Sequence, residues 1–108
     1  MILRLGCAFL FAASLPALAA DAAAGKARAV QCIACHGTDG LSKLPNAPNL
    51  AGQPELYLSA QLKAYREGAR NDPMMSVIAK QLKDEDIANL AAWYASIEVT
   101  AKVPNEAP

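Results

Sequence analysis

The sequence contains few of the residues that most metal sites and catalytic sites use. Its 108 residues include one histidine, three cysteines and 6% aromatic residues. Ten basic side chains balance ten acidic ones, so no excess of positive charge favours binding to nucleic acid or to an anionic membrane surface. No internal repeat and no Gly/Ser-rich linker divides the chain, and a chain of this length indicates one domain.

The N-terminal residues show the pattern of an exported protein. A basic residue, Arg4, precedes an uncharged apolar stretch over residues 5–20 that contains the small-residue sequence Ala17-Leu18-Ala19. A membrane anchor is the alternative, but this stretch falls short of the roughly 18 apolar residues that suggest a span. We therefore expect residues 1–19 to be a signal peptide, which directs the protein to the periplasm, and no membrane span to remain after its removal.

The rest of the chain predicts helices. Turn-forming residues are dense in one long loop, helical apolar periodicity flanks it, and no segment alternates apolar and polar residues as a half-buried strand would. We expect an all-α fold with helices over residues 21–34, 54–67 and 84–97, a shorter one over 76–82, and a flexible tail over 99–108. The buried stripe of the last helix should comprise Ile87, Leu90, Ala91, Tyr94 and Ile97.

The strongest motif is Cys-x-x-Cys-His, formed by Cys32, Cys35 and His36. This is the attachment signature of c-type haem, in which each thiol bonds to a vinyl group and the histidine faces the iron. A thioredoxin-like pair would accompany a βαβ pattern, and a zinc site would need further ligands, both of which the sequence lacks. A structural disulfide would not explain why the sole histidine follows directly. The motif predicts one covalently bound haem c per chain.

Several segments together resemble bacterial class I cytochromes c, in particular the short single-haem forms and one half of the two-haem forms. The resemblance is carried by Gly25, by residues 32–37, by Pro48-Asn49-Leu50-Ala51-Gly52-Gln53, by Pro73-Met74-Met75 and by residues 84–94. It implies a cytochrome c domain over residues 20–98, with three main helices and short helical turns wrapped around the haem. It also implies that a glycine at position 25 allows close contact with Trp93 in the last helix.

The second axial ligand of the iron has two candidates, because the only histidine is already assigned. Met74 and Met75 are the methionines that follow the proposed signal peptide, and a Met/His pair suits electron transfer. In an extended loop their side chains would point apart, so that one coordinates and the other packs. The resemblance assigns the ligand to Met75, although the family often has a second methionine where this chain has Ile78.

Further roles follow from the resemblance. The backbone carbonyl of Pro48 is expected to accept a hydrogen bond from the ring of His36. Arg70 is expected to contact a haem propionate, with a solvated helix face as the alternative. Family members often have Ser at the position of Lys83, so we expect Asp84 to take over the N-cap of the last helix.

These features predict an electron carrier. We do not expect it to be an enzyme, and we assign no catalytic residues. We expect its partners to be redox proteins, and we expect it to bind neither nucleic acid nor a membrane. One alternative is a haem-bearing subunit of a periplasmic dehydrogenase or oxidase complex. A gas-binding or peroxidase-like haem protein is disfavoured, because it needs an open iron and no second histidine is present to act as an acid or base.

Overall fold

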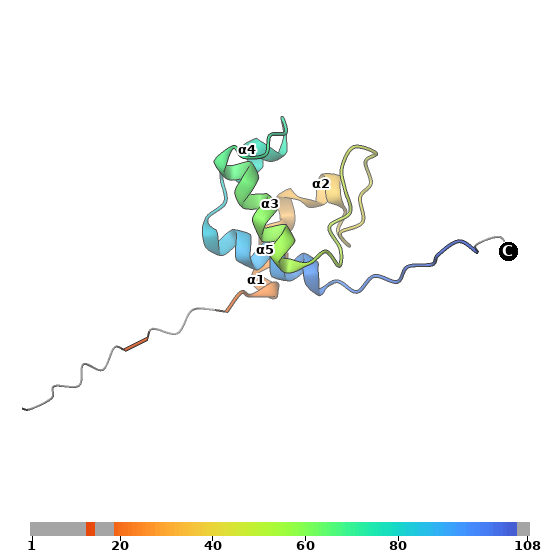
Figure 1. Cartoon of the computed structure of the whole chain (residues 1–108), viewed down its shortest axis with the longest axis horizontal. Coiled ribbons are helices and arrows are strands. Elements are labelled where there is room, and N and C mark those ends of the chain that lie inside the picture. The colour runs from red at the N-terminus through yellow and green to blue at the C-terminus, as the bar shows by residue number, and fades with distance from the viewer. Residues whose placement is uncertain (1–12, 15–18, 106–108) are drawn as a thin grey trace, which may run out of the picture.

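Five α-helices and one 3₁₀ turn follow one another in the computed structural model, which describes residues 13–14 and 19–105 (Figure 1). The described part contains no strand, and none of its helices is long and apolar enough to cross a membrane. The predicted signal peptide, residues 1–19, lies outside the described residues except for positions 13, 14 and 19. In chain order the elements are α1 (Ala22–Arg28), η1 (Ala29–Gln31), α2 (Ile33–His36), α3 (Glu55–Glu67), α4 (Met75–Ala79) and α5 (Asp84–Ser96).

The first helix is shorter than the single helix predicted over residues 21–34. Asp21 caps α1 as expected, because its carboxylate accepts a hydrogen bond from the backbone N–H of Ala24 at 3.1 Å. After Arg28 the backbone tightens into η1, and α2 begins only after Cys32. Ala29, which begins η1, is 2% exposed in the core. Packing therefore interrupts a segment whose composition favours a continuous helix.

α1 crosses α5 at Gly25, where the backbones of the two helices approach closely. A methyl group at Gly25 would overlap the carbonyl of Asn89 and would lie 2.9 Å from Cβ of Trp93. The predicted contact with Trp93 is thus present, but the backbone of Asn89 is the tighter constraint. Only glycine fits at this point of α1.

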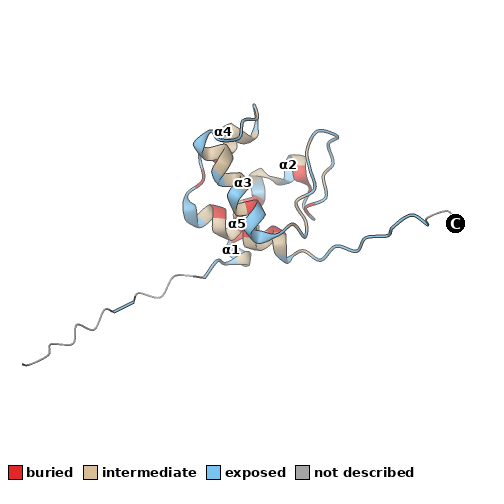
Figure 2. Ribbon diagram, in the orientation of Figure 1, coloured by how far each residue is buried: buried red, intermediate tan, exposed pale blue. Residues whose placement is uncertain are grey.

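The core lies where α5 meets α1 and α3, and Figure 2 shows buried positions concentrated there. The predicted stripe of α5 is confirmed at four of its positions, whereas Ile97 is partly buried and lies just beyond the helix. Ile87 is fully buried and Leu90 is 2% exposed. The buried apolar cluster comprises Ala29, Leu58, Leu82, Ile87, Leu90, Ala91 and Tyr94.

The start of α5 differs from the prediction. Asp84 does not cap this helix: the N-cap is Lys83, whose backbone N–H donates to the carboxylate of Asp86 at 2.9 Å. Asp84 instead forms an ion pair with Arg66 of α3 at 2.7 Å, and Arg66 also donates to the carbonyl of Leu82 at 3.3 Å. A side chain three residues into a helix reaches its N-cap amide readily, which leaves Asp84 free to join α3 to α5.

A substitution at Gly25 tests the helix crossing. We expect Gly25→Ala to lower the free energy of unfolding by about 1–3 kcal/mol, because the added methyl group forces the helices apart. Chemical denaturation monitored by circular dichroism would measure the change. The control is Ala27→Leu, on the exposed side of α1, which should stay within about 0.5 kcal/mol of wild type. A Gly25→Ala protein as stable as wild type would contradict the assigned crossing.

The pair between Arg66 and Asp84 predicts a pH dependence of stability. The hydrogen bond from Arg66 lowers the pKa of the Asp84 carboxyl. The stabilisation is therefore complete above the ordinary Asp pKa of about 3.9, and it is lost as the pH falls through the lower folded value. Below about pH 4, the melting temperature of wild type should fall more steeply than that of Asp84→Asn. Glu85 is the exposed neighbour of Asp84, and in Glu85→Gln the melting temperature should fall with pH as steeply as in wild type. If the melting temperatures of wild type and Asp84→Asn fall equally steeply, the result contradicts the ion pair.

Candidate functional site

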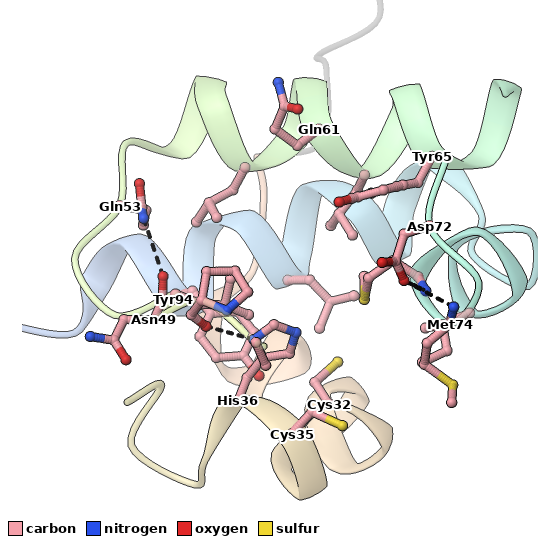
Figure 3. A pocket seen from close by; sticks show the side chains of 18 of the residues that line it. Cys32, Cys35, His36, Asn49, Gln53, Gln61, Tyr65, Asp72, Met74 and Tyr94 are labelled. Atoms are coloured by element: carbon pink, nitrogen blue, oxygen red, sulfur yellow. Dashed lines mark hydrogen bonds between the residues drawn. The ribbon is translucent and has the colours of Figure 1, made fainter. Parts of the chain in front are cut away.

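A cavity of about 360 Å³ opens between the Cys-x-x-Cys-His segment and α3 (Figure 3). This volume lies in the range of about 300–1,000 Å³ that is typical of ligand and cofactor pockets. Its apolar lining comes from α3, α4, α5 and the connecting loops, and it comprises Leu44, Leu50, Leu58, Leu62, Ile78, Leu82 and Leu90. Cys32, Cys35, His36, Pro48, Arg70 and Met75 all line the same cavity, so the structure brings together every site residue that the sequence predicted.

The two cysteines and the histidine are held by a single short helical turn. The backbone N–H of His36 donates to the carbonyl of Cys32 at 2.9 Å, and α2 ends at His36, before Gly37, whose φ of 80° favours glycine. Residues three apart on a helix share a face, which places both thiols on the cavity side. Both cysteines are partly buried free thiols, and His36 is 6% exposed.

The surroundings of the Cys32 thiol favour its protonated form. Burial is the main reason that its pKa lies above the ordinary thiol value, although the Tyr94 hydroxyl and Arg28 oppose this effect. A reactive thioredoxin-like cysteine needs the opposite shift, towards the thiolate. Among the described residues no group of three or more His, Cys, Asp or Glu side chains could hold a metal ion. The site therefore favours haem attachment over a thioredoxin-like pair or a zinc centre.

The ring of His36 has a fixed orientation. Its Nδ1 atom lies 2.8 Å from the carbonyl oxygen of Pro48 (Figure 3). Because a carbonyl can only accept, Nδ1 carries the hydrogen, and the lone pair of Nε2 is left for a metal. Pro48 is held in turn by its loop, in which the carbonyl of Gly40 accepts from the N–H groups of Leu50 at 2.8 Å and Ala51 at 3.0 Å.

The two methionines line the cavity at the start of α4 (Met75–Ala79), and they differ in exposure. Met74 is 59% exposed and its side chain lies at the margin of the site in Figure 3, whereas Met75 is partly buried. The extended loop that we expected here is absent: Met74 has helical angles, with φ −95° and ψ −52°, and Met75 begins α4. Successive helical residues point about 100° apart, so the two side chains still diverge.

Asp72 fixes the backbone of both methionines, and the sequence analysis missed it. Its carboxylate accepts from the N–H groups of Met74 at 2.9 Å and Met75 at 2.8 Å, and these bonds lower the pKa of the Asp72 carboxyl. The backbone N–H of Asp72 donates to the hydroxyl of Ser76 at 3.0 Å. An Asp followed by Pro is a signal for a helix start that would have revealed this role.

Arg70 borders the cavity but already has partners in α3. Its guanidinium donates to the side-chain oxygen of Gln61 at 2.7 Å and lies 4.6 Å from the centre of the Tyr65 ring. This arrangement holds the positive charge at the rim of the cavity, where an acidic group of a ligand could reach it. Contact with a haem propionate remains a prediction.

The cavity also contains buried polar atoms that suit a bound cofactor. The hydroxyl of Tyr94 and the side-chain nitrogen of Gln31 are buried without a hydrogen-bond partner among the described residues, and both residues line the cavity. Tyr94 lies near enough to Cys32 for each group to affect the pKa of the other, but not in hydrogen-bond geometry. Unpaired buried groups are rare in folded proteins and call for a missing partner. A haem anchored at Cys32 and Cys35 fits both the apolar lining and these polar atoms.

Comparisons with known proteins identify one family. The Cytochrome c family profile matches residues 22–98. The chain is 51% identical over 83 residues to cytochrome c-554(548) of Halomonas halodenitrificans, covering 74% of this chain and all of that protein. It is 43% identical over 82 residues to the thiosulfate dehydrogenase electron acceptor of Thiomonas intermedia, covering 74% of this chain and 37% of that protein.

A solved structure shows the same fold. Reduced recombinant cytochrome c4 from Pseudomonas stutzeri matches with a TM-score of 0.70 and 38% identity, covering 74% of this chain and 47% of that one. The chain thus spans less than half of the cytochrome c4 and of the Thiomonas protein. The predicted class I fold, with α1, α3 and α5 as its main helices, is confirmed. With the motif, the fixed histidine and the apolar cavity, these matches show that the chain belongs to the cytochrome c family.

Proposed function

We propose that this protein is a periplasmic electron carrier that transfers one electron at a time through a single haem c. The observation that supports this function best is the pairing across one cavity of a histidine with a fixed ring and a methionine with a fixed backbone. Two such ligands favour an iron that stays six-coordinate, which suits electron transfer and not substrate binding.

Haem c is bound covalently through Cys32 and Cys35, and it supplies an iron that accepts and releases one electron. We propose His36 and Met75 as its axial ligands, and the partly buried position of Met75 supports it over the exposed Met74. The carbonyl of Pro48 fixes the tautomer of His36 and raises the basicity of its other nitrogen. The apolar lining excludes water, so little has to reorganise when the charge of the site changes.

We propose that the chain transforms no substrate. Members of the cytochrome c family are electron carriers, and the only histidine of this sequence is assigned to the iron. No second imidazole is therefore available to move protons at a ligand bound to the iron. Arg70 is proposed as a contact of a haem propionate, since its guanidinium stands at the rim of the cavity.

A second function is favoured by the names of two relatives, one of them from Thiomonas intermedia. The Thiomonas protein is named for accepting electrons from thiosulfate dehydrogenase, and this chain covers 37% of it. A role as the cytochrome subunit of a periplasmic dehydrogenase would use the same haem and the same ligands. Size-exclusion chromatography of the native protein would separate the two roles: a free carrier elutes at the mass of one small protein, and a subunit elutes with its enzyme.

The proposed maturation can be measured directly. We expect export to remove residues 1–19, leaving a cytochrome domain over residues 20–98 followed by a tail over 99–108. Intact-mass spectrometry of the periplasmic fraction should give the mass of residues 20–108 plus one haem. Cys35→Ser should reduce the covalent link to a single bond and lower the yield of mature protein. A mature mass that includes residues 1–19 would contradict the assignment of the signal peptide.

The assignment of Met75 predicts a change of ligation in Met75→Ala. The oxidised wild-type protein should show the weak red absorption band of a Met sulfur bound to iron, and the reduced protein should not bind carbon monoxide. Met75→Ala should lose the band and bind carbon monoxide, because it leaves the iron without its weaker axial ligand. Met74→Ala is the matched control and should keep the wild-type spectrum. The opposite pattern would move the ligand to Met74, and no change in either variant would contradict Met ligation.

A further inference from the structure

The segment that carries Met75 is joined to the rest of the protein at two places. At its start, the carboxylate of Asp72 binds the N–H groups of Met74 and Met75. At its end, Arg66 of α3 binds the carbonyl of Leu82 at 3.3 Å. Between these points lies α4, with five residues, which is too short to be stable without support from its surroundings. The position of the Met75 side chain therefore depends on these connections.

The contacts of Asp72 act directly on the residue that would hold the iron. The bond to the N–H of Met75, at 2.8 Å, is one of two that its carboxylate makes to this backbone. A reciprocal pair of bonds joins Asp72 to Ser76: the hydroxyl of Ser76 accepts from the N–H of Asp72, and the N–H of Ser76 donates to the carbonyl of Asp72, both at 3.0 Å. Pro73 lies between them and has no N–H that needs a partner. Asp72 and Ser76, which lie on either side of Met75 in the sequence, are thus hydrogen-bonded to each other at the start of α4.

We propose that Asp72 is a positioning residue, which keeps the backbone of Met75 in the conformation that presents its sulfur to the iron. This inference rests on the proposed ligation by Met75. Hydrogen bonds from backbone amides to a carboxylate are stronger than bonds between neutral groups. Without them the segment opens more often, and Met75 leaves the iron in a larger fraction of molecules. Asp72 would act on the iron only through Met75.

A purely structural role would have a different signature. Loss of a stabilising side chain lowers the free energy of unfolding wherever it lies, whereas loss of positioning raises the fraction of molecules in which only this segment is open. Asp39 provides a matched comparison, because its carboxylate accepts a backbone hydrogen bond from Leu41 at 3.0 Å in the loop that follows α2. That loop belongs to the His36 side of the cavity.

Displacement of Met75 by imidazole tests the proposal. In the oxidised haem-loaded protein, added imidazole replaces the Met sulfur, so the iron–sulfur bond breaks and an iron–nitrogen bond forms. The apparent affinity for imidazole is proportional to the fraction of molecules in which the iron is free of Met75. It can be titrated through the loss of the red Met band, and Met75→Ala provides the reference for an iron that has no competing ligand.

We expect Asp72→Ala to bind imidazole at least about tenfold more tightly than wild type. Loss of the charge-assisted hydrogen bonds should raise the fraction of molecules in which the iron is free of Met75 by about this factor. Asp72→Asn keeps an accepting oxygen but no charge, so its affinity for imidazole should lie between those of wild type and Asp72→Ala. It serves as the test if the alanine variant does not mature. Asp39→Ala should stay within about twofold of wild type even where denaturation shows that it is less stable.

Three results would overturn the proposal. If Asp72→Ala and Asp72→Asn bind imidazole as wild type does while Met75→Ala binds it far more tightly, Asp72 has no positioning role and the ligation by Met75 stands. If Asp39→Ala tightens binding as much as Asp72→Ala, the effect is one of general stability. If wild type and Met75→Ala bind imidazole equally, Met75 is not the ligand, and the proposed ligation fails together with this inference.

Discussion

The crossing of α1 over α5 at Gly25 determines where the haem-binding residues stand. α5 carries half of the buried apolar side chains among the described residues, and the backbone of Asn89 lies against Gly25. From that crossing the chain runs through η1 directly into Cys32 and α2. η1 and α2 are too short to be stable without support from their surroundings. The positions of the two thiols and of His36 therefore depend on the packing of α1 against the core.

The two proposed axial ligands are held with different rigidity. His36 is buried, and its ring is fixed by the carbonyl of Pro48 in a loop with its own backbone hydrogen bonds. Met75 is only partly buried, and its backbone N–H donates to the carboxylate of Asp72 in a segment with few buried residues. The histidine side should therefore stay intact under conditions that open the methionine side, since regions with fewer buried contacts open at lower free energy.

Much of this arrangement follows from the sequence, and what does not follow has identifiable physical causes. The Cys-x-x-Cys-His motif, the all-α class and the stripe of α5 were predicted because motif chemistry and helical periodicity are local properties. The break after Arg28 was missed because it depends on packing, which overrides the high helix propensity of the segment. Asp84 was wrongly assigned as an N-cap because its partner, Arg66, is distant in the sequence. Asp72 was missed although the signal was local.

The cavity links folding of this chain to its cofactor. A chain of this size buries a limited apolar core, and several of its apolar side chains, among them Leu58, Leu62 and Leu90, line the cavity. The hydroxyl of Tyr94 and the side-chain nitrogen of Gln31 line the cavity and have no hydrogen-bond partner among the described residues, and a buried polar group without a partner costs about 1–3 kcal/mol. Such costs fall on the folded state alone, since water satisfies the same groups in the unfolded chain. A haem attached at Cys32 and Cys35 would cover the apolar lining, and its polar groups could supply such partners, so its attachment would stabilise the folded chain.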